Sequence, residues 1–112
     1  MNSKQKGARG EREAAQALRD CLGIEARRGM QFCGSEESPD VKTSLAGVHF
    51  EVKRTEKLSI YKAMEQASGD CGSKVPVVLH RSNHKEWLCI IKLADLMRLA
   101  NLLKGLEDGK AV

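Results

Sequence analysis

The sequence has few aromatic residues and no long hydrophobic run. Two Phe, one Tyr and one Trp among 112 residues are too few and too dispersed to form a platform on which the bases of a single strand could stack. No apolar run approaches the length of a membrane span, and the opening MNSKQKGARGERE lacks the apolar stretch that a signal peptide needs. We therefore expect a cytoplasmic protein without a membrane segment, in which any binding of nucleic acid depends mainly on charge.

Closely spaced cysteine pairs are absent as well. The four cysteines stand far apart, with no Cys-x-x-Cys pair, at Cys21, Cys33, Cys71 and Cys89. The histidines are spaced irregularly, at His49, His80 and His84. Neither pattern is typical of a zinc site or of a histidine acid–base pair, so we expect buried free thiols, and histidines in the core or in turns.

Length and charge limit the remaining possibilities. A chain of 112 residues, 30% of them charged, is long enough for one compact domain, residues 1–112, and too short for two. Its 19 Lys and Arg exceed its 15 Asp and Glu, which gives a net charge of +4, and several basic residues crowd near the N-terminus. This balance favours a polyanionic partner, although many proteins with such a charge have none.

Periodic apolar residues predict the secondary structure. We expect helices over residues 9–22, from Ser59 to Gly69 or Gly72, and over 93–106, and strands over 24–28, 40–45, 48–54, 74–81 and 86–92. The last two strands are continuous apolar runs, which are typical of the centre of a sheet, and Trp87 is expected in the core. The order of the elements predicts an α/β (α+β) fold with a small mixed β-sheet flanked by helices.

The strands over 40–45 and 48–54 alternate between apolar and polar residues. A two-residue turn at Ala46-Gly47 would join them as a hairpin. This register places Val41 opposite Val52, and Asp40 opposite Lys53. Ala-Gly is not the best pair for such a turn, and an error of one residue in the register would exchange the two faces of one strand.

On this register four charged side chains share one face of the hairpin. They are Asp40, Lys42, Glu51 and Lys53. Asp40 and Glu51 become diagonal neighbours, and two carboxylates that lie so close repel each other unless a positive charge lies between them. A Mg²⁺ ion, which takes one or two carboxylates and keeps several waters, suits such a pair.

The same mixture of charges is common on exposed hairpin faces, where it serves solubility, and the hairpin alone leaves that alternative open. Glu11 provides an independent argument. It lies four residues before Ala15 and seven before Leu18, so it continues the buried stripe of the first helix. Glu13, by the same period, points away. Glu11 would add a third acid to the site.

Several segments resemble one family of nucleases. Pro39-Asp40, followed after ten residues by Glu51-Val52-Lys53, resembles the motif of the PD-(D/E)xK nuclease superfamily. The segment KGARGERE is similar to the opening helix of archaeal and phage Holliday junction resolvases, and IYKAMEQA and KVPVVLHRSNHKEWL are similar to later parts of small phage members. The resemblance therefore covers the chain from about Lys6 to about Leu99.

The resemblance implies a restriction-endonuclease-like core and a Mg²⁺-dependent endodeoxyribonuclease, for which Mn²⁺ can substitute. Its expected substrate is the four-way DNA junction, cut by a homodimer during DNA recombination or phage DNA processing in a bacterial or phage-infected cell. A VRR-NUC-like nuclease that cuts flaps or nicks DNA is a second possibility of the same class. A non-catalytic DNA-binding protein is the alternative of another class.

The resemblance also assigns roles to individual residues. It implies metal binding by Glu11, Asp40, Glu51 and Val52. Lys53 matches the catalytic lysine, and Gln66 matches a glutamine that many relatives place beside the active site, although an ordinary surface glutamine would look the same. Glu36 and Glu37 add negative charge in the loop before Asp40, with no role that the sequence decides.

Basic residues near these acids are candidates for contact with the DNA backbone. Arg12 matches a basic residue expected to touch DNA phosphate. The others assigned to the DNA surface are Lys6, Arg9, Arg27 and Arg28. His49 shares the face of Glu51, so we expect it to line the site.

Overall fold

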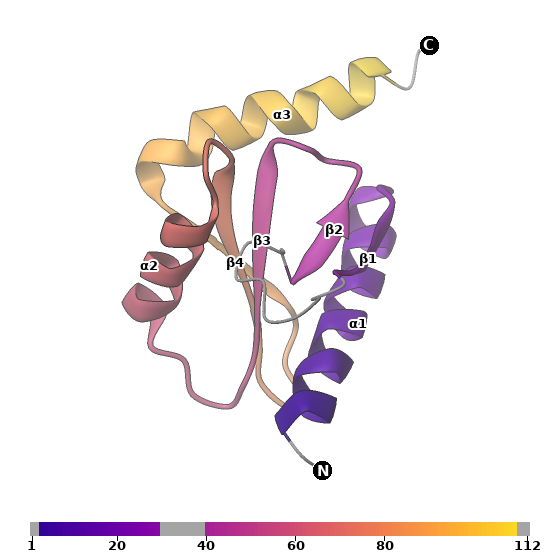
Figure 1. Ribbon diagram of the computed structural model, residues 1–112. Helices are drawn as coiled ribbons and strands as arrows, with labels where there is room; N and C mark the ends of the chain where they lie inside the picture. Colours follow the sequence, from indigo (N-terminus) through magenta and orange to yellow (C-terminus); the bar gives the residue numbers. More distant parts are fainter. Residues whose placement is uncertain (1–2, 30–39, 110–112) are drawn as a thin grey trace.

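A computed structural model describes residues 3–29 and 40–109, with side chains for 7–29 and 40–106. In these ranges the chain forms five strands, three α-helices and a short 3₁₀ helix (Figure 1). Their bounds are α1 Ser3–Leu22, β1 Ala26–Arg28, β2 Val41–Thr43, β3 Val48–Arg54, α2 Ile60–Asp70, β4 Val75–Arg81, β5 Leu88–Ile91, η1 Leu93–Asp95 and α3 Leu96–Gly109. The predicted α/β class is confirmed.

The strands form one mixed sheet in the order in which they occur along the chain. β3 and β4 are parallel, and the remaining neighbours are antiparallel. A parallel pair needs a crossover connection, and α2 supplies it between β3 and β4. The predicted central position is confirmed for β4, whereas β5 lies at the edge of the sheet.

Helices cover both faces of the sheet (Figure 1). α1 and α3 pack on one face, where Leu18 and Leu99 join a core with Phe50 and Val77. α2 packs on the other face, where Ala63, Met64 and Ala67 surround Val78. Because both faces are covered, the middle of β4 is apolar at consecutive positions, as in buried parallel strands generally.

The predicted pairing of β2 with β3 is wrong by two residues. Val41 lies opposite Phe50, not opposite Val52, because a longer connection replaces the expected two-residue turn. Within it, the Thr43 hydroxyl accepts a hydrogen bond of 3.1 Å from the amide of Leu45. A shift of two residues leaves every side chain on its predicted face, since the period of a strand is two.

β3 is buried on both faces at its start. Val48 and Phe50 point into the core beneath α1 and α3. His49 and Glu51, on the face covered by α2, are only 4% and 5% exposed. The interpretation of this face as a solvent-exposed charged surface is therefore wrong for Glu51.

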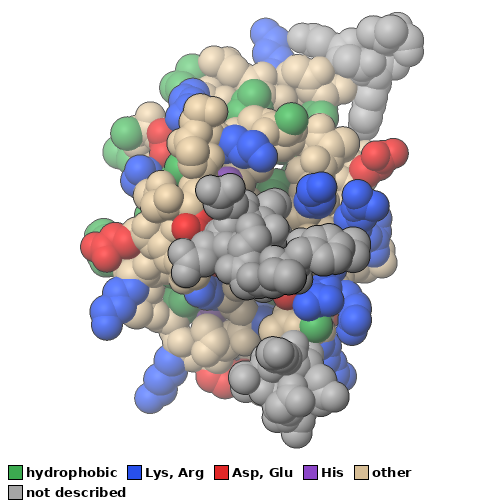
Figure 2. All heavy atoms as spheres, viewed as in Figure 1, with side chains coloured by type: hydrophobic (Ala, Val, Ile, Leu, Met, Phe, Trp, Pro, Cys, Tyr) green, Lys and Arg blue, Asp and Glu red, His purple; other side chains and the backbone are tan. Residues whose placement is uncertain are grey.

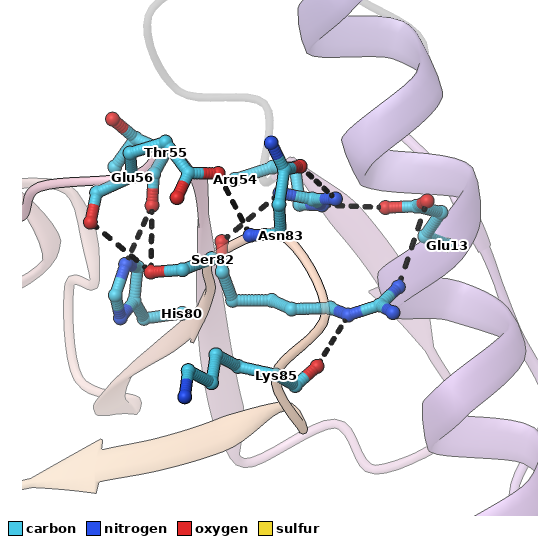
Figure 3. Close-up of polar contacts among 9 residues, drawn as sticks. Glu13, Arg54, Thr55, Glu56, His80, Ser82, Asn83 and Lys85 are labelled. Atoms are coloured by element: carbon cyan, nitrogen blue, oxygen red, sulfur yellow. Dashed lines mark hydrogen bonds and ion pairs between the residues drawn. The ribbon is translucent and has the colours of Figure 1, made fainter.

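α1 lies close against the far end of β3. Gly10 is required there, because a Cβ atom at this position would stand 2.6 Å from Cβ of Arg54. Glu13 accepts a hydrogen bond of 2.9 Å from Arg54 and lies 3.7 Å from Arg81 (Figure 3). Arg54 also donates to Asn83 over 2.9 Å. The expectation that Glu13 points away from the sheet is wrong: this network fixes α1, and with it Glu11.

The other predicted core residues divide between the interior and the surface. Trp87 packs against the main core, and His80 lies within 2.9 Å of the Thr55 carbonyl. His84 lies in a turn with a φ of 61°.

Cys21 and Cys89 are free but exposed, so their predicted burial is wrong. Cys71 is free and half-buried, and Cys33 lies outside the described residues. None of the helices in the described ranges combines the length and apolarity needed to cross a membrane.

Candidate active site

Asp40 and Glu51 form a pair of carboxyl groups at the junction of β2 and β3. One step along from the Val41 and Phe50 pair, the antiparallel register brings Asp40 beside Glu51. Oδ2 of Asp40 accepts a hydrogen bond of 2.8 Å from the backbone amide of Val52. This contact fixes the Asp40 carboxyl against the strand that carries Glu51.

The two carboxyl groups differ in their affinity for protons. Burial, and then a hydrogen bond with Glu51, raise the pKa of Asp40 to about 7. Burial also acts to raise the pKa of Glu51, but its contacts with His49 and Asp40 and the charge of Lys53 outweigh that effect and lower it. The two pKa values shift in opposite directions, so Asp40 is the member of the pair that binds a proton more readily, because two adjacent carboxylates repel each other.

Lys53 follows on the same face of β3. Its Nζ donates a hydrogen bond of 2.7 Å to Oε1 of Gln66 on α2. Its charge acts on Glu51, so the ammonium group stands at the edge of the acidic pair. The structure thus brings together Lys53 and Gln66, both of which the family resemblance assigned to the active site.

Glu11 approaches the same place from α1. Its side chain is 13% exposed, and its carboxylate lies 3.3 Å from Nε of Arg28. Burial raises the pKa of Glu11, the ion pair with Arg28 lowers it, and repulsion by Glu51 raises it. Repulsion by Glu11 also raises the pKa of Asp40. The predicted inward direction of Glu11 is confirmed, and its carboxylate acts on both members of the pair.

The arrangement suits a divalent cation. Among the described residues, neither Asp40 nor Glu51 forms an ion pair with Lys or Arg, so their repulsion is not relieved by a bound basic side chain. Hard divalent cations prefer clustered carboxylate oxygens. Val52 could reach a cation only through its main chain, because its side chain packs against the core.

Two further residues belong to this site: His49, which the sequence predicts to line it, and Asp70, to which the sequence gives no role. Nε2 of His49 lies 3.5 Å from Oε1 of Glu51. Asp70, the last residue of α2, places a carboxylate oxygen so that single atoms of His49, Glu51 and Asp70 all lie within 4.8 Å of one another. The sequence indicates His49 because strand alternation places it on the same face as Glu51. No pattern in the sequence indicates Asp70, because only the crossover through α2 brings it to the sheet.

The basic residues assigned to DNA lie on α1 and β1. Arg9, Arg12, Arg27 and Arg28 are exposed, and Lys and Arg side chains gather on this side of the molecule, at the right of Figure 2. Arg28 is held by Glu11, whereas the others are turned to solvent. The side chain of Lys6, and Pro39, Glu36 and Glu37, lie outside the described residues.

Comparisons with known proteins add no relative: no family model matches the chain, and neither the curated proteins nor the solved structures contain a match.

Proposed function

We propose that this chain is a divalent-metal-dependent DNA endonuclease. The observation that carries the proposal is the adjacent pair of the half-buried Asp40 and the buried Glu51, which has no Lys or Arg counter-ion in an ion pair among the described residues and lies beside Lys53. Buried carboxyl groups without such a counter-ion destabilise a fold, and they are typical of functional sites. The family resemblance of the surrounding motif supports the same activity.

In this proposal Asp40 and Glu51 would hold a Mg²⁺ ion, and Glu11 would complete the set of acids. When bound, the cation supplies Lewis-acid chemistry for hydrolysis of a phosphodiester. Binding of a cation by Asp40 would compete with protonation of its carboxyl group, because the carboxylate is the form that binds a metal. The carboxylate of Glu11 lies 3.3 Å from Nε of Arg28, so Arg28 would compete with the cation for it.

Lys53 contributes positive charge where negative charge develops on the scissile phosphate. Gln66 is a positioning residue, because its amide oxygen accepts from Lys53 and holds the ammonium group at the rim of the acidic pair. The exposed arginines of α1 and β1 continue from this rim as a path for the DNA backbone. The proposed substrate is branched DNA, with the four-way junction first, and two symmetric cuts at a junction call for a homodimer.

The test is cleavage of labelled DNA by the full chain. Four-way junction, flap, nicked duplex and linear duplex are incubated with Mg²⁺, with Mn²⁺, or with EDTA. Asp40→Asn is the test variant, because an asparagine oxygen can still accept from the Val52 amide. Asp20→Asn is the matched control, since Asp20 is an exposed acid on α1 bonded only to Gln16 among the described residues.

The expected result is metal-dependent cutting by the parent and by Asp20→Asn, and a loss of at least about a thousandfold in Asp40→Asn, comparable to the removal of an essential electrostatic group. If no substrate is cut with either metal, the proposed nuclease activity is refuted. If flaps or nicked duplex are cut and junctions are not, the nuclease activity stands and the four-way junction is rejected as its substrate. Salt-sensitive binding without any cutting would favour a non-catalytic DNA-binding protein.

A further inference from the structure

His49 has an unusual environment for a buried imidazole. The residue is 4% exposed, and Nε2 has no hydrogen-bond partner among the described residues. Oε1 of Glu51 is 3.5 Å away, beyond the usual length of a hydrogen bond. A buried polar atom without a partner destabilises a fold, so stability of the fold does not explain the position of this nitrogen.

The position of the Asp70 carboxylate does not stabilise the fold either. It is the last residue of α2, where the partial negative charge of the helix terminus disfavours a carboxylate. α2 has no basic residue in its last turn, and Asp70 forms no ion pair within the described ranges. Its carboxylate nevertheless lies toward His49 and Glu51, with one atom from each of the three within 4.8 Å of the other two.

We propose that His49, Glu51 and Asp70 form a second cation site, which shares Glu51 with the Asp40 site and takes a first-row transition cation such as Mn²⁺ or Zn²⁺. Ligand atoms about 2.1 Å from a metal stand about 3 to 4 Å from each other, so the three groups need to close by only about 1 Å. Asp70 can make this movement because it is exposed. An orphaned imidazole nitrogen is then a ligand, and the unfavourable acid at the helix end has a partner.

The ligand set decides the class of cation. Mg²⁺ prefers an all-oxygen shell, whereas imidazole combined with carboxylates suits Mn²⁺, Co²⁺ and Zn²⁺. The Asp40 site, built from carboxylates, suits Mg²⁺. Since Glu51 belongs to both, this inference rests on the site of the proposed function, and it predicts two neighbouring cations of different preference bridged by one carboxylate.

The test is metal binding by the full chain without DNA. Zn²⁺ is titrated while the ring nitrogens of His49 are followed by ¹⁵N NMR, and Mn²⁺ binding is measured by calorimetry with and without excess Mg²⁺. Asp70→Asn is the test variant and Glu65→Gln the matched control, because Glu65 is an exposed acid on the same helix. Asp40→Asn tests whether the two sites are separate.

The parent and Glu65→Gln should show a Zn²⁺-dependent shift of the His49 ring signals that Mg²⁺ does not reproduce. Asp70→Asn should bind Zn²⁺ about tenfold more weakly or worse, and Asp40→Asn should keep the response. Unchanged His49 signals in the parent, equal affinities of Asp70→Asn and Glu65→Gln, or loss of the response in Asp40→Asn would each overturn the second site. None of these results depends on cleavage, so a failed nuclease assay and a failed metal titration refute different proposals.

Discussion

The two faces of β3 differ although they belong to the same seven residues. Val48 and Phe50 point into the core beneath α1 and α3, where removal of apolar surface from water stabilises the fold by about 25 cal/mol per Å². Glu51 and its neighbours on the other face lie under α2, where burial acts against their charges. One face therefore holds the strand in place, while the other carries charged groups whose burial does not stabilise the fold.

The largest effect is expected from a change that breaks the apolar face. Phe50→Ala removes a ring that is 3% exposed, and such truncations cost about 3 to 5 kcal/mol of unfolding free energy. Glu51→Gln, one residue along, keeps the shape of the side chain, so it should abolish cleavage at a much smaller cost in stability. Urea unfolding in EDTA gives the first quantity, and DNA cleavage with Mg²⁺ gives the second.

The contrast between the faces fails if Glu51→Gln unfolds as readily as Phe50→Ala, since Glu51 would then be a structural residue. It also fails if Glu51→Gln cleaves DNA like the parent. A folded Phe50→Ala protein, obtained at low temperature, should retain metal-dependent cutting, because Phe50 points away from the acids.

A second effect, on the order of 2 kcal/mol, is expected from the proton held by Asp40. Its pKa rises on folding from an ordinary 3.8 to about 7. The folded state therefore binds more protons than the unfolded state in this interval, so the contribution to stability is full below pH 4 and is lost as pH rises through 7. The complete shift corresponds to about 4 kcal/mol, and partial access of solvent reduces it.

Asp40→Asn removes this titration. In EDTA the variant should gain stability relative to the parent between pH 5 and pH 8, as measured by urea unfolding at each pH. Mg²⁺ should stabilise the parent at pH 8 more than at pH 6, because the cation competes with the proton for Asp40, and should act less on the variant. A pH-independent difference between the two proteins would show that Asp40 holds no proton in the folded state.

A smaller effect concerns the close contact between Gly10 on α1 and Arg54 at the end of β3. Gly10→Ala places a methyl group against Arg54, at a distance of 2.6 Å in the present packing, and such overpacking costs about 1 to 2 kcal/mol. Gly7→Ala is the matched control, since nothing lies within 4 Å of its Cβ position and alanine favours a helix by up to about 1 kcal/mol. Thermal unfolding should move in opposite directions for the two variants; equal shifts would mean that α1 does not depend on close contact with Arg54.

Local patterns in the sequence predict the elements well and their partners less well. The bounds of β3 and the start of α2 after Ser59 agree with the structure, although the Ser59 side chain makes no capping hydrogen bond. The alternation of a strand and the apolar period of a helix act over a few residues, so the sequence shows them directly. The pairing of β2 with β3 was predicted two residues out, since the sequence does not show how many residues a turn will use. The shared face of Asp40 and Glu51 was nevertheless predicted, because an even shift keeps it.

What the sequence could not show depends on contacts between distant segments. The helical period alone predicts that Glu13 points away from the buried stripe of the helix, but Arg54 and Arg81 reach it from β3 and β4. Asp70 has an ordinary setting in the sequence and meets His49 only through the parallel pairing of β3 with β4. β5 has the composition of a central strand, and its place at the edge follows from the topology of the whole sheet.

The smallest expected effect on stability comes from Arg28, which links the acidic site to the basic surface. In its ion pair with Glu11 the Arg28 side chain is 43% exposed, and such pairs contribute about 0 to 1 kcal/mol to the free energy of unfolding.

If Arg28 leaves Glu11 for a phosphate when DNA and metal bind, Arg28→Ala should lower the slope of log affinity against log salt by about 1. Arg27→Ala, the exposed neighbour without an acidic partner among the described residues, should lower the slope equally while leaving the pKa of Glu11 unchanged. Only Arg28→Ala should raise that pKa further, because the guanidinium that lowers it is gone. Carboxyl ¹³C NMR without DNA separates the two variants, and an identical Glu11 titration in both would mean that Arg28 does not hold Glu11 in solution.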